Sequence, residues 1–154
     1  MANTKIKRDR LNFGSLPAFR AELSSATAIA DNTYTTIVFD TERFDTGGNY
    51  NNTTGVFTAP EAGVYQFNAV LRFDTMASGE NVIIVLFVND QYARYSMFTG
   101  TGSTPSAQIS ESFYMDAGDT ARVYAYQNDG AGASNNLLGT ASTGYVTFSG
   151  HKIG

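Results

Sequence analysis

The chain has 154 residues, no cysteine, no tryptophan and a formal net charge of −4 at pH 7. This length suits one domain with its own hydrophobic core. The lack of cysteine excludes disulfides, zinc–thiolate sites and iron–sulfur clusters, and the acidic balance argues against a general nucleic-acid binder. Only 16% of the residues are charged and 13% are aromatic, a composition that favours strands with a neutral polar surface.

The first fifteen residues are polar and basic, with positive charges at Lys5, Lys7, Arg8 and Arg10. We expect residues 1–15 to form a flexible basic arm, either a solvated terminus or a docking segment for a larger assembly. The arm lacks the apolar core of a signal peptide. No apolar run approaches the ~18 residues of a membrane-spanning helix. Residues 16–154 are expected to form the folded domain.

Short segments rich in β-branched and aromatic residues follow one another, separated by Gly, Asn, Asp, Ser and Pro. They predict about ten strands and no helix. The expected strands cover 16–30, 33–40, 55–59, 63–74, 81–90, 91–98, 107–115, 120–127 and 144–153, with a turn and short-strand region at 47–55. Many short strands at regular spacing are typical of a β-sandwich or jelly roll.

Two of these segments indicate where the core lies. In 63–74, one face carries Tyr65, Phe67, Ala69, Leu71 and Phe73, and we expect this face to fill the sandwich. The segment 81–90 is apolar on both faces. A strand of this kind is covered on both sides, so we expect the second sheet on one side and a subunit or loop on the other.

Aromatic residues and a glycine recur at fixed intervals around the central strand. The spaced residues are Phe39, Asp45, Tyr50, Phe57, Gly63, Tyr65 and Phe67, and Phe148 opens a Phe-Ser-Gly near the end. This spacing resembles the signature of the C1q globular-head domain, a trimeric jelly roll related to the tumour-necrosis-factor family. The resemblance covers residues 16–153. It departs from the family at Ala69, where the family has an aromatic residue, and the chain has no collagen-like Gly-x-y stalk.

The resemblance implies an all-β, ten-stranded C1q/TNF-like jelly-roll sandwich that forms a homotrimer. It implies a structural role in the core for Phe39, Tyr50, Phe57, Gly63, Tyr65, Phe67 and Phe148. By analogy with the family, a mixed polar and tyrosine face lines the threefold axis, and the alternative is an ordinary solvent face. The expected trimer-interface residues are Gln66, Asn68, Val70, Tyr114, Tyr145 and Thr147.

The sequence has no catalytic constellation, and we expect the protein not to be an enzyme. A Ser-His-Asp triad or a His-ligated cupin metal would have to rely on His151, the one histidine. Calcium is the candidate cofactor, because members of the resembled family often bind it through loop carboxylates. No EF-hand spacing selects a site, so the metal ligands stay unassigned among Asp45, Asp74, Glu80, Asp90, Asp116, Asp119 and Asp129.

These observations predict a non-enzymatic trimeric recognition or adhesion head of a bacterial or phage surface type. It would bind a glycan or protein ligand through the loops 47–55, 99–106 and 128–143, whose Asn, Thr and Gly residues give adaptable hydrogen bonding. The expected location is extracellular or on a cell or virion surface, and a cytoplasmic location stays open. The expected partners are other copies of the chain and the ligand, with no nucleic acid and no membrane insertion. The alternative function is a purely structural trimerisation or fibre-capping module.

Overall fold

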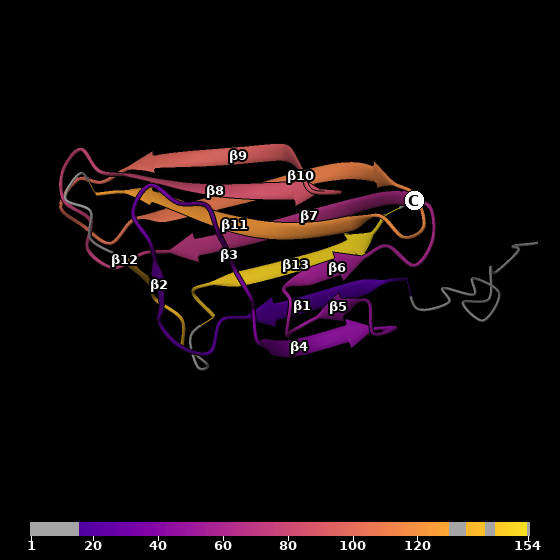
Figure 1. Cartoon of the computed structure of the whole chain (residues 1–154). Helices are drawn as coiled ribbons and strands as arrows, with labels where there is room; N and C mark the ends of the chain where they lie inside the picture. Colours follow the sequence, from indigo (N-terminus) through magenta and orange to yellow (C-terminus); the bar gives the residue numbers. More distant parts are fainter. Residues whose placement is uncertain (1–15, 130–134, 141–143, 154) are drawn as a thin grey trace, which may run out of the picture.

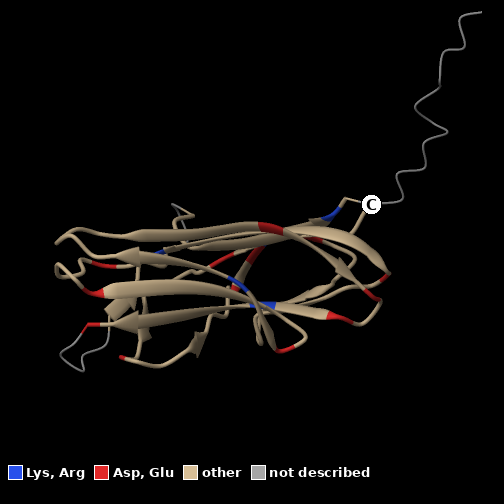
Figure 2. Cartoon of the chain, turned by 90° about the horizontal axis from the view of Figure 1, so that it is seen from above, with Lys and Arg blue, Asp and Glu red and all other residues tan. Residues whose placement is uncertain are grey.

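A computed structural model describes residues 16–129, 135–140 and 144–153, which form strands and connecting segments without a helix (Figure 1). The predicted basic arm, 1–15, lies outside these residues. Viewed from above, the strands run lengthwise in two layers along which Lys, Arg, Asp and Glu are sparse (Figure 2). No helical segment in the described part of the chain has the length and hydropathy to cross a bilayer.

One layer is a five-stranded antiparallel sheet in which β7 and β10 are the longest strands. The strands, in spatial order, are β10 (Ser106–Met115), β7 (Gly63–Arg72), β13 (Thr147–Lys152), β1 (Ala18–Glu22) and β4 (Thr41–Thr46). Residues of β7 alternate strictly between buried and partly exposed. This sheet therefore has one core face and one outer face.

The second layer is a six-stranded sheet. Its main path is β5 (Tyr50–Asn51), β6 (Val56–Thr58), β11 (Thr120–Asn128), β8 (Asn81–Val88) and β9 (Gln91–Thr99), and β3 (Thr35–Thr36) also pairs with β11. A small third sheet joins β2 (Thr27–Ile29) to β12 (Asn135–Leu137). The jelly-roll fold class is confirmed. The described residues hold thirteen strands rather than ten because several paired segments are only two or three residues long.

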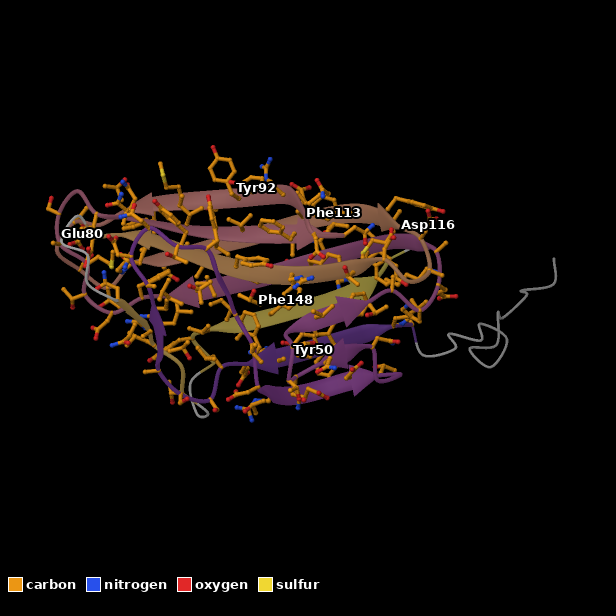
Figure 3. The ribbon with its side chains drawn as sticks, in the orientation of Figure 1. Tyr50, Glu80, Tyr92, Phe113, Asp116 and Phe148 are labelled. Atoms are coloured by element: carbon orange, nitrogen blue, oxygen red, sulfur yellow. The ribbon has the colours of Figure 1, made fainter. Side chains whose placement is uncertain are left out.

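Aromatic rings fill the space between the two large sheets. Phe19 of β1 stacks on Tyr50 with 4.8 Å between ring centroids, on Phe57 at 4.9 Å, and meets the edge of Phe148 at 4.9 Å. Tyr50 and Phe148 are labelled in Figure 3. The spaced aromatic residues are all buried: Phe39, Tyr50, Phe57, Tyr65, Phe67 and Phe148. Burial of these rings, together with the aliphatic side chains of the core, is the main favourable contribution to the stability of the sandwich.

The spacing of Phe39, Asp45 and Tyr50 has a hydrogen-bonding cause. The Tyr50 hydroxyl accepts from the backbone N–H of Phe39 and donates to its carbonyl oxygen, each at 3.2 Å. A carboxylate oxygen of Asp45 accepts from the backbone N–H of Tyr50 at 2.8 Å. These bonds satisfy backbone groups that have no partner in a neighbouring strand. Buried backbone N–H and carbonyl groups need such partners, because an unpaired one is costly.

The expected strand over 33–40 is correct only at Thr35–Thr36. Beyond these residues the chain continues with buried Ile37 and Phe39 in irregular backbone. Ile37 donates its N–H to the carbonyl of Val123, and Phe39 uses the Tyr50 hydroxyl. The segment is apolar because it is buried, although its backbone is not paired as a regular strand.

Candidate interaction surfaces

The sequence-predicted interface residues come together on the outer surface of the five-stranded sheet, which we call the assembly face. Along β7, Gln66, Asn68 and Val70 point outward. The register places Val70 beside Thr147 of β13 and places Tyr114 of β10 beside Val64. Tyr145 lies just before β13. Five neighbouring side chains thus share one face, with Tyr145 at its border.

Side chains on this face bond to one another in a ladder of amides and hydroxyls. Ser110 donates to Oδ1 of Asn68 at 2.8 Å, and Gln66 donates to Ser110 at 3.1 Å. Ser112 donates to the amide oxygen of Gln66. The ladder is uncharged and several of its polar groups are already paired with one another, which lowers the desolvation cost of covering it with a partner.

Two tyrosines rise above this neutral ladder. Tyr114 is 67% exposed and Tyr145 is 41% exposed. The guanidinium of Arg72 lies 4.4 Å from the centroid of the Tyr145 ring, a cation–π contact. Exposed tyrosines beside a charge-poor centre match the composition of protein interfaces.

A charged cluster lies on the β1 side of the same face. Glu22 is 4% exposed and receives hydrogen bonds from Arg43 at 2.7 Å and from Arg20 at 3.0 Å. The Arg43 hydrogen bond lowers the pKa of Glu22, with further help from the charges of both arginines, while burial opposes the shift. The carboxylate is therefore charged at neutral pH and ties β1 to β4.

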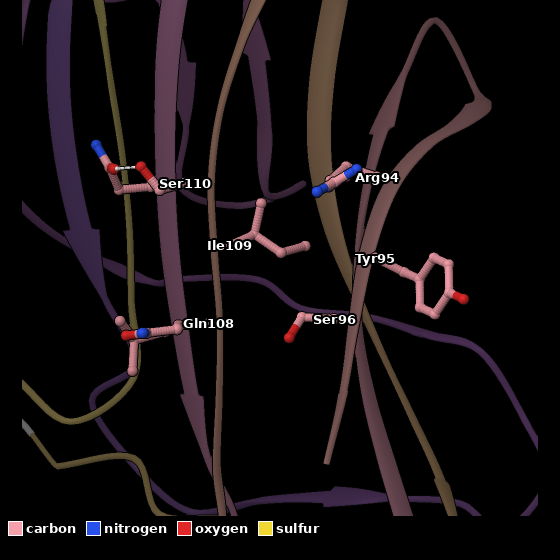
Figure 4. A pocket seen from close by; sticks show the side chains of 8 residues that line it. Arg94, Tyr95, Ser96, Gln108, Ile109 and Ser110 are labelled. Atoms are coloured by element: carbon pink, nitrogen blue, oxygen red, sulfur yellow. Dashed lines mark hydrogen bonds between the residues drawn. The ribbon is translucent and has the colours of Figure 1, made fainter.

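The strands β9 and β10 are edge strands of the two different sheets and lie next to each other. They are not paired in one sheet, and we call this side of the sandwich the open edge. Arg94 of β9 and Glu111 of β10 bridge this open edge at 3.3 Å. A depression of about 410 Å³ lies beside them. Arg94 and Ser96 point across it toward Ile109, whereas Tyr95 points away (Figure 4). Asn68 and Val70 also line the depression, so the open edge is continuous with the assembly face.

The three loops expected to bind ligand do not form one surface. Gly47 and Asn49 of the first loop line a depression together with Glu61. Glu61 lies just before β7, so this loop lies near the start of that strand. Ser103 instead pairs with Met76, beyond the far end of β7. Of the loop 128–143, residues 130–134 and 141–143 lie outside the described part. A single binding site made of all three loops is therefore excluded by the length of β7.

The loop 47–55 forms a groove of its own. Asn51 caps its turn by accepting from the N–H groups of Thr53 and Thr54. The groove has a volume of about 870 Å³ and is lined mostly by uncharged polar side chains, together with Val56, Pro60 and Arg122. Arg122 pairs with Asp90. The groove can hold a polar ligand through hydrogen bonds.

The acids considered for calcium are not gathered into one cluster, although Asp116 and Asp119 share a turn. Within the described residues, no group of three or more His, Asp or Glu could hold a metal ion. Glu80 and Asp116 lie at opposite ends of the domain (Figure 3). Asp45 and Glu80 accept backbone hydrogen bonds, from Tyr50 and Ala77 respectively. These carboxylates hold turns in place.

Comparison with protein families finds a match to the C1q domain over residues 18–153. Comparison with curated proteins finds no match. Among solved structures, the globular domain of zebrafish complement 1qA superposes with a TM-score of 0.67 at 15% identity, over 90% of this chain and 98% of that chain.

Two further structures show the same fold. The Eiger TNF of S. frugiperda superposes with a TM-score of 0.62 at 11% identity, over 90% of this chain and 91% of its own. Murine APRIL gives a TM-score of 0.62 at 10% identity, over 90% and 99% of the two chains. At these identities the likeness shows the fold alone.

Proposed function

Because the chain belongs to the C1q domain family, we propose that it is a non-enzymatic recognition head that works as a homotrimer. In this proposal the assembly face lines the threefold axis. The observation that carries it is the hydrogen-bonded, uncharged ladder of Gln66, Asn68, Ser110 and Ser112, flanked by exposed Tyr114. A surface of this kind is suited to burial against another subunit.

The open edge supplies the second surface that a ring requires. A cyclic trimer is built from heterologous contacts, in which two different surfaces of each subunit meet. The assembly face and the open edge share β10, so each subunit presents two adjoining surfaces. We propose that the open edge of one subunit packs against the assembly face of the next.

The proposed ligand is a glycan or a protein, and the proposed location is extracellular or on a cell or virion surface of bacterial or phage type. Among the expected loops, 47–55 is favoured because its groove is lined by Asn, Thr and Arg122. Amide, hydroxyl and guanidinium groups can form hydrogen bonds to either class of ligand.

A charge introduced into the assembly face tests the trimer. In Asn68→Arg, three guanidiniums would meet at the interface, where like charges cost several kcal/mol. We expect sedimentation velocity to show dissociation of this variant. The matched control is Thr58→Arg, at an exposed position on the other sheet, and it should sediment like the wild type. An Asn68→Arg variant that keeps the wild-type sedimentation coefficient would contradict the proposed interface.

Binding separates recognition from the structural alternative. A recognition head should give hits in a glycan array or a cell-binding screen, and changes in the 47–55 loop such as Asn52→Ala with Thr54→Ala should weaken them. A fibre-capping module should assemble normally and bind nothing in either screen.

A further inference from the structure

The outer surface of the six-stranded sheet carries a continuous layer of aromatic and aliphatic side chains, which we call the tyrosine face. Three neighbouring strands, β11, β8 and β9, contribute side chains that stand side by side in rows. The rows, from one end, are Arg122–Phe87–Tyr92, Tyr124–Val85–Tyr95, Tyr126–Ile83–Met97 and Asn128–Asn81–Thr99. The first three rows form the tyrosine face, and Tyr34 adds its ring beside Tyr126 at 4.9 Å.

The rings of this face contact one another. Phe87 lies 4.5 Å from Tyr124 and 5.7 Å from Tyr92, measured between ring centroids, and Tyr92 lies 5.7 Å from Tyr95. Val85 is fully buried beneath this layer although it lies on the outer side of β8. Contacts between rings fix their orientation, so the face is an ordered platform rather than a set of independent side chains.

Much of this platform is exposed to solvent. The exposed fraction is 47% for Tyr34, 49% for Tyr92, 54% for Tyr95 and 56% for Met97. The face therefore differs from the aromatic core, where rings cover one another completely. A contiguous exposed patch of this kind is typical of a binding surface.

The face is almost without charge. Among the outward-pointing residues of the four rows, Arg122 alone is charged, and it is paired with Asp90. The last row is made of amides and a hydroxyl, with Thr99 donating to Asn81 at 2.8 Å. An anionic ligand would find no unpaired cation on this face, whereas a neutral ligand matches it in charge.

The hydroxyl groups of the face are largely available. Tyr126 donates to Oδ1 of Asn32 at 2.9 Å. The hydroxyls of Tyr34, Tyr92, Tyr95 and Tyr124 make no hydrogen bond to the described residues. Partial burial, together with the neighbouring phenols of Tyr34 and Tyr95, raises the pKa of Tyr92, so this group stays a neutral donor and acceptor.

We propose that the tyrosine face binds a neutral polysaccharide chain. A sugar ring has an apolar C–H surface, which stacks on a tyrosine ring, and hydroxyls at its edge, which bond to phenols and amides. An exposed sheet surface suits an extended chain rather than a small molecule, which prefers a cavity. A contact with a second copy of the chain is the competing explanation of this face. Such a contact would have to supply hydrogen-bond partners for the tyrosine hydroxyls as well as cover the rings. The inference rests on the proposed recognition function and names its ligand class, on a sheet surface rather than a loop.

Affinity electrophoresis tests this inference. The full chain would be run through gels that contain dextran, mixed-linkage β-glucan, hydroxyethylcellulose or galactomannan, with alginate and heparin as anionic polymers. We expect retardation by at least one neutral polymer. Removing two half-exposed rings, in Tyr92→Ala with Tyr95→Ala, should weaken that binding about tenfold or more. The control is Phe44→Ala, which removes a 51% exposed ring from β4 and should bind as the wild type does.

A second pair of variants separates stacking from hydroxyl contacts. Tyr92→Phe with Tyr95→Phe keeps both rings and should retain most of the binding that the alanine variant loses. The inference is overturned if no neutral polymer retards the chain, if only the anionic polymers do, or if the alanine variant binds normally. It is also overturned if the alanine variant changes the mass measured by light scattering, because the face would then be a contact between copies.

The polysaccharide-binding result and the oligomeric state of the wild-type chain test separate proposals. A trimer without polysaccharide binding removes this inference and leaves the proposed assembly intact. A monomer whose binding depends on Tyr92 and Tyr95 removes the assembly and leaves the inference standing.

Discussion

Replacing Tyr50 with phenylalanine removes one oxygen from the core and keeps the ring that stacks on Phe19. Two backbone groups of Phe39 then lose their partner, since the hydroxyl serves both its N–H and its carbonyl. Water does not reach them, because Phe39 is 0% exposed and Tyr50 is 5% exposed. Each buried group left unpaired costs about 1–3 kcal/mol, so we expect Tyr50→Phe to lower the free energy of unfolding by about 2–5 kcal/mol.

Urea unfolding followed by circular dichroism, at one fixed protein concentration, measures this loss. The control is Tyr126→Phe, whose hydroxyl bonds to Asn32 at the surface and should change the stability by about 1 kcal/mol or less. If Tyr50→Phe is no less stable than Tyr126→Phe, the hydroxyl does not have the structural role assigned to it.

The same residue predicts an alkaline limit to stability. Burial raises the pKa of Tyr50 above its usual value of about 10. The unfolded chain then loses this proton at a lower pH than the folded chain does, so stability is complete below about pH 10 and decreases above it. This decrease should be smaller in Tyr50→Phe. An equal decrease in both proteins would show that other groups cause it.

Two further predictions concern the five-stranded sheet. A methyl group at Gly150 would lie 2.6 Å from the Phe67 ring, so Gly150→Ala should cost about 1–3 kcal/mol in urea unfolding, whereas Ser149→Ala, on the outer face, should cost less than about 0.5 kcal/mol. The Arg43 hydrogen bond lowers the pKa of Glu22 from its ordinary 4.5. The ionised Glu22 therefore stabilises the fold above that pH, and this contribution is lost as the pH falls through the folded-state pKa. Glu22→Gln should therefore destabilise the protein by about 1–2 kcal/mol at pH 7 and by much less at pH 3. A loss of stability that is the same at both pH values would contradict the assigned ion pairs.

The sequence predicts strands best where burial alternates along the chain. The expected core residues Tyr65, Phe67, Ala69 and Leu71 of β7, and Phe73 just after it, are all buried. The signal is local, because side chains of a strand alternate between its two faces. The fold class follows from several such segments together with the spaced aromatic motif.

Segments with weak alternation were predicted less well. The sequence does not predict the strand β4, Thr41–Thr46, because it lies at the sheet edge, half of its residues are exposed and none is buried. The sequence predicts a strand from Ile37 to Phe39, but the segment lacks regular strand pairing. The N–H and carbonyl of Phe39 bond to the Tyr50 hydroxyl, and the N–H of Ile37 makes a single backbone bond to Val123. Hydrophobicity reports burial and does not identify the hydrogen-bonding partner.

The tyrosine face could not be predicted from the sequence. Each of its strands looks like an ordinary half-buried strand, and 81–90 was expected to have its second side covered by a subunit or loop. In the structure, Val85 of this strand is buried between Tyr124 of β11 and Tyr95 of β9. The face exists because β8 lies between β11 and β9, and strand order depends on contacts between distant parts of the chain.

The solution mass of the wild-type chain tests the central claim most directly. Multi-angle light scattering on the eluting protein should give a mass near three chains of 16.6 kDa each, as expected for a C1q-family head assembled through the face around Asn68. A single-chain mass that persists as the protein concentration rises would contradict the trimer, and with it the assignment of the assembly face.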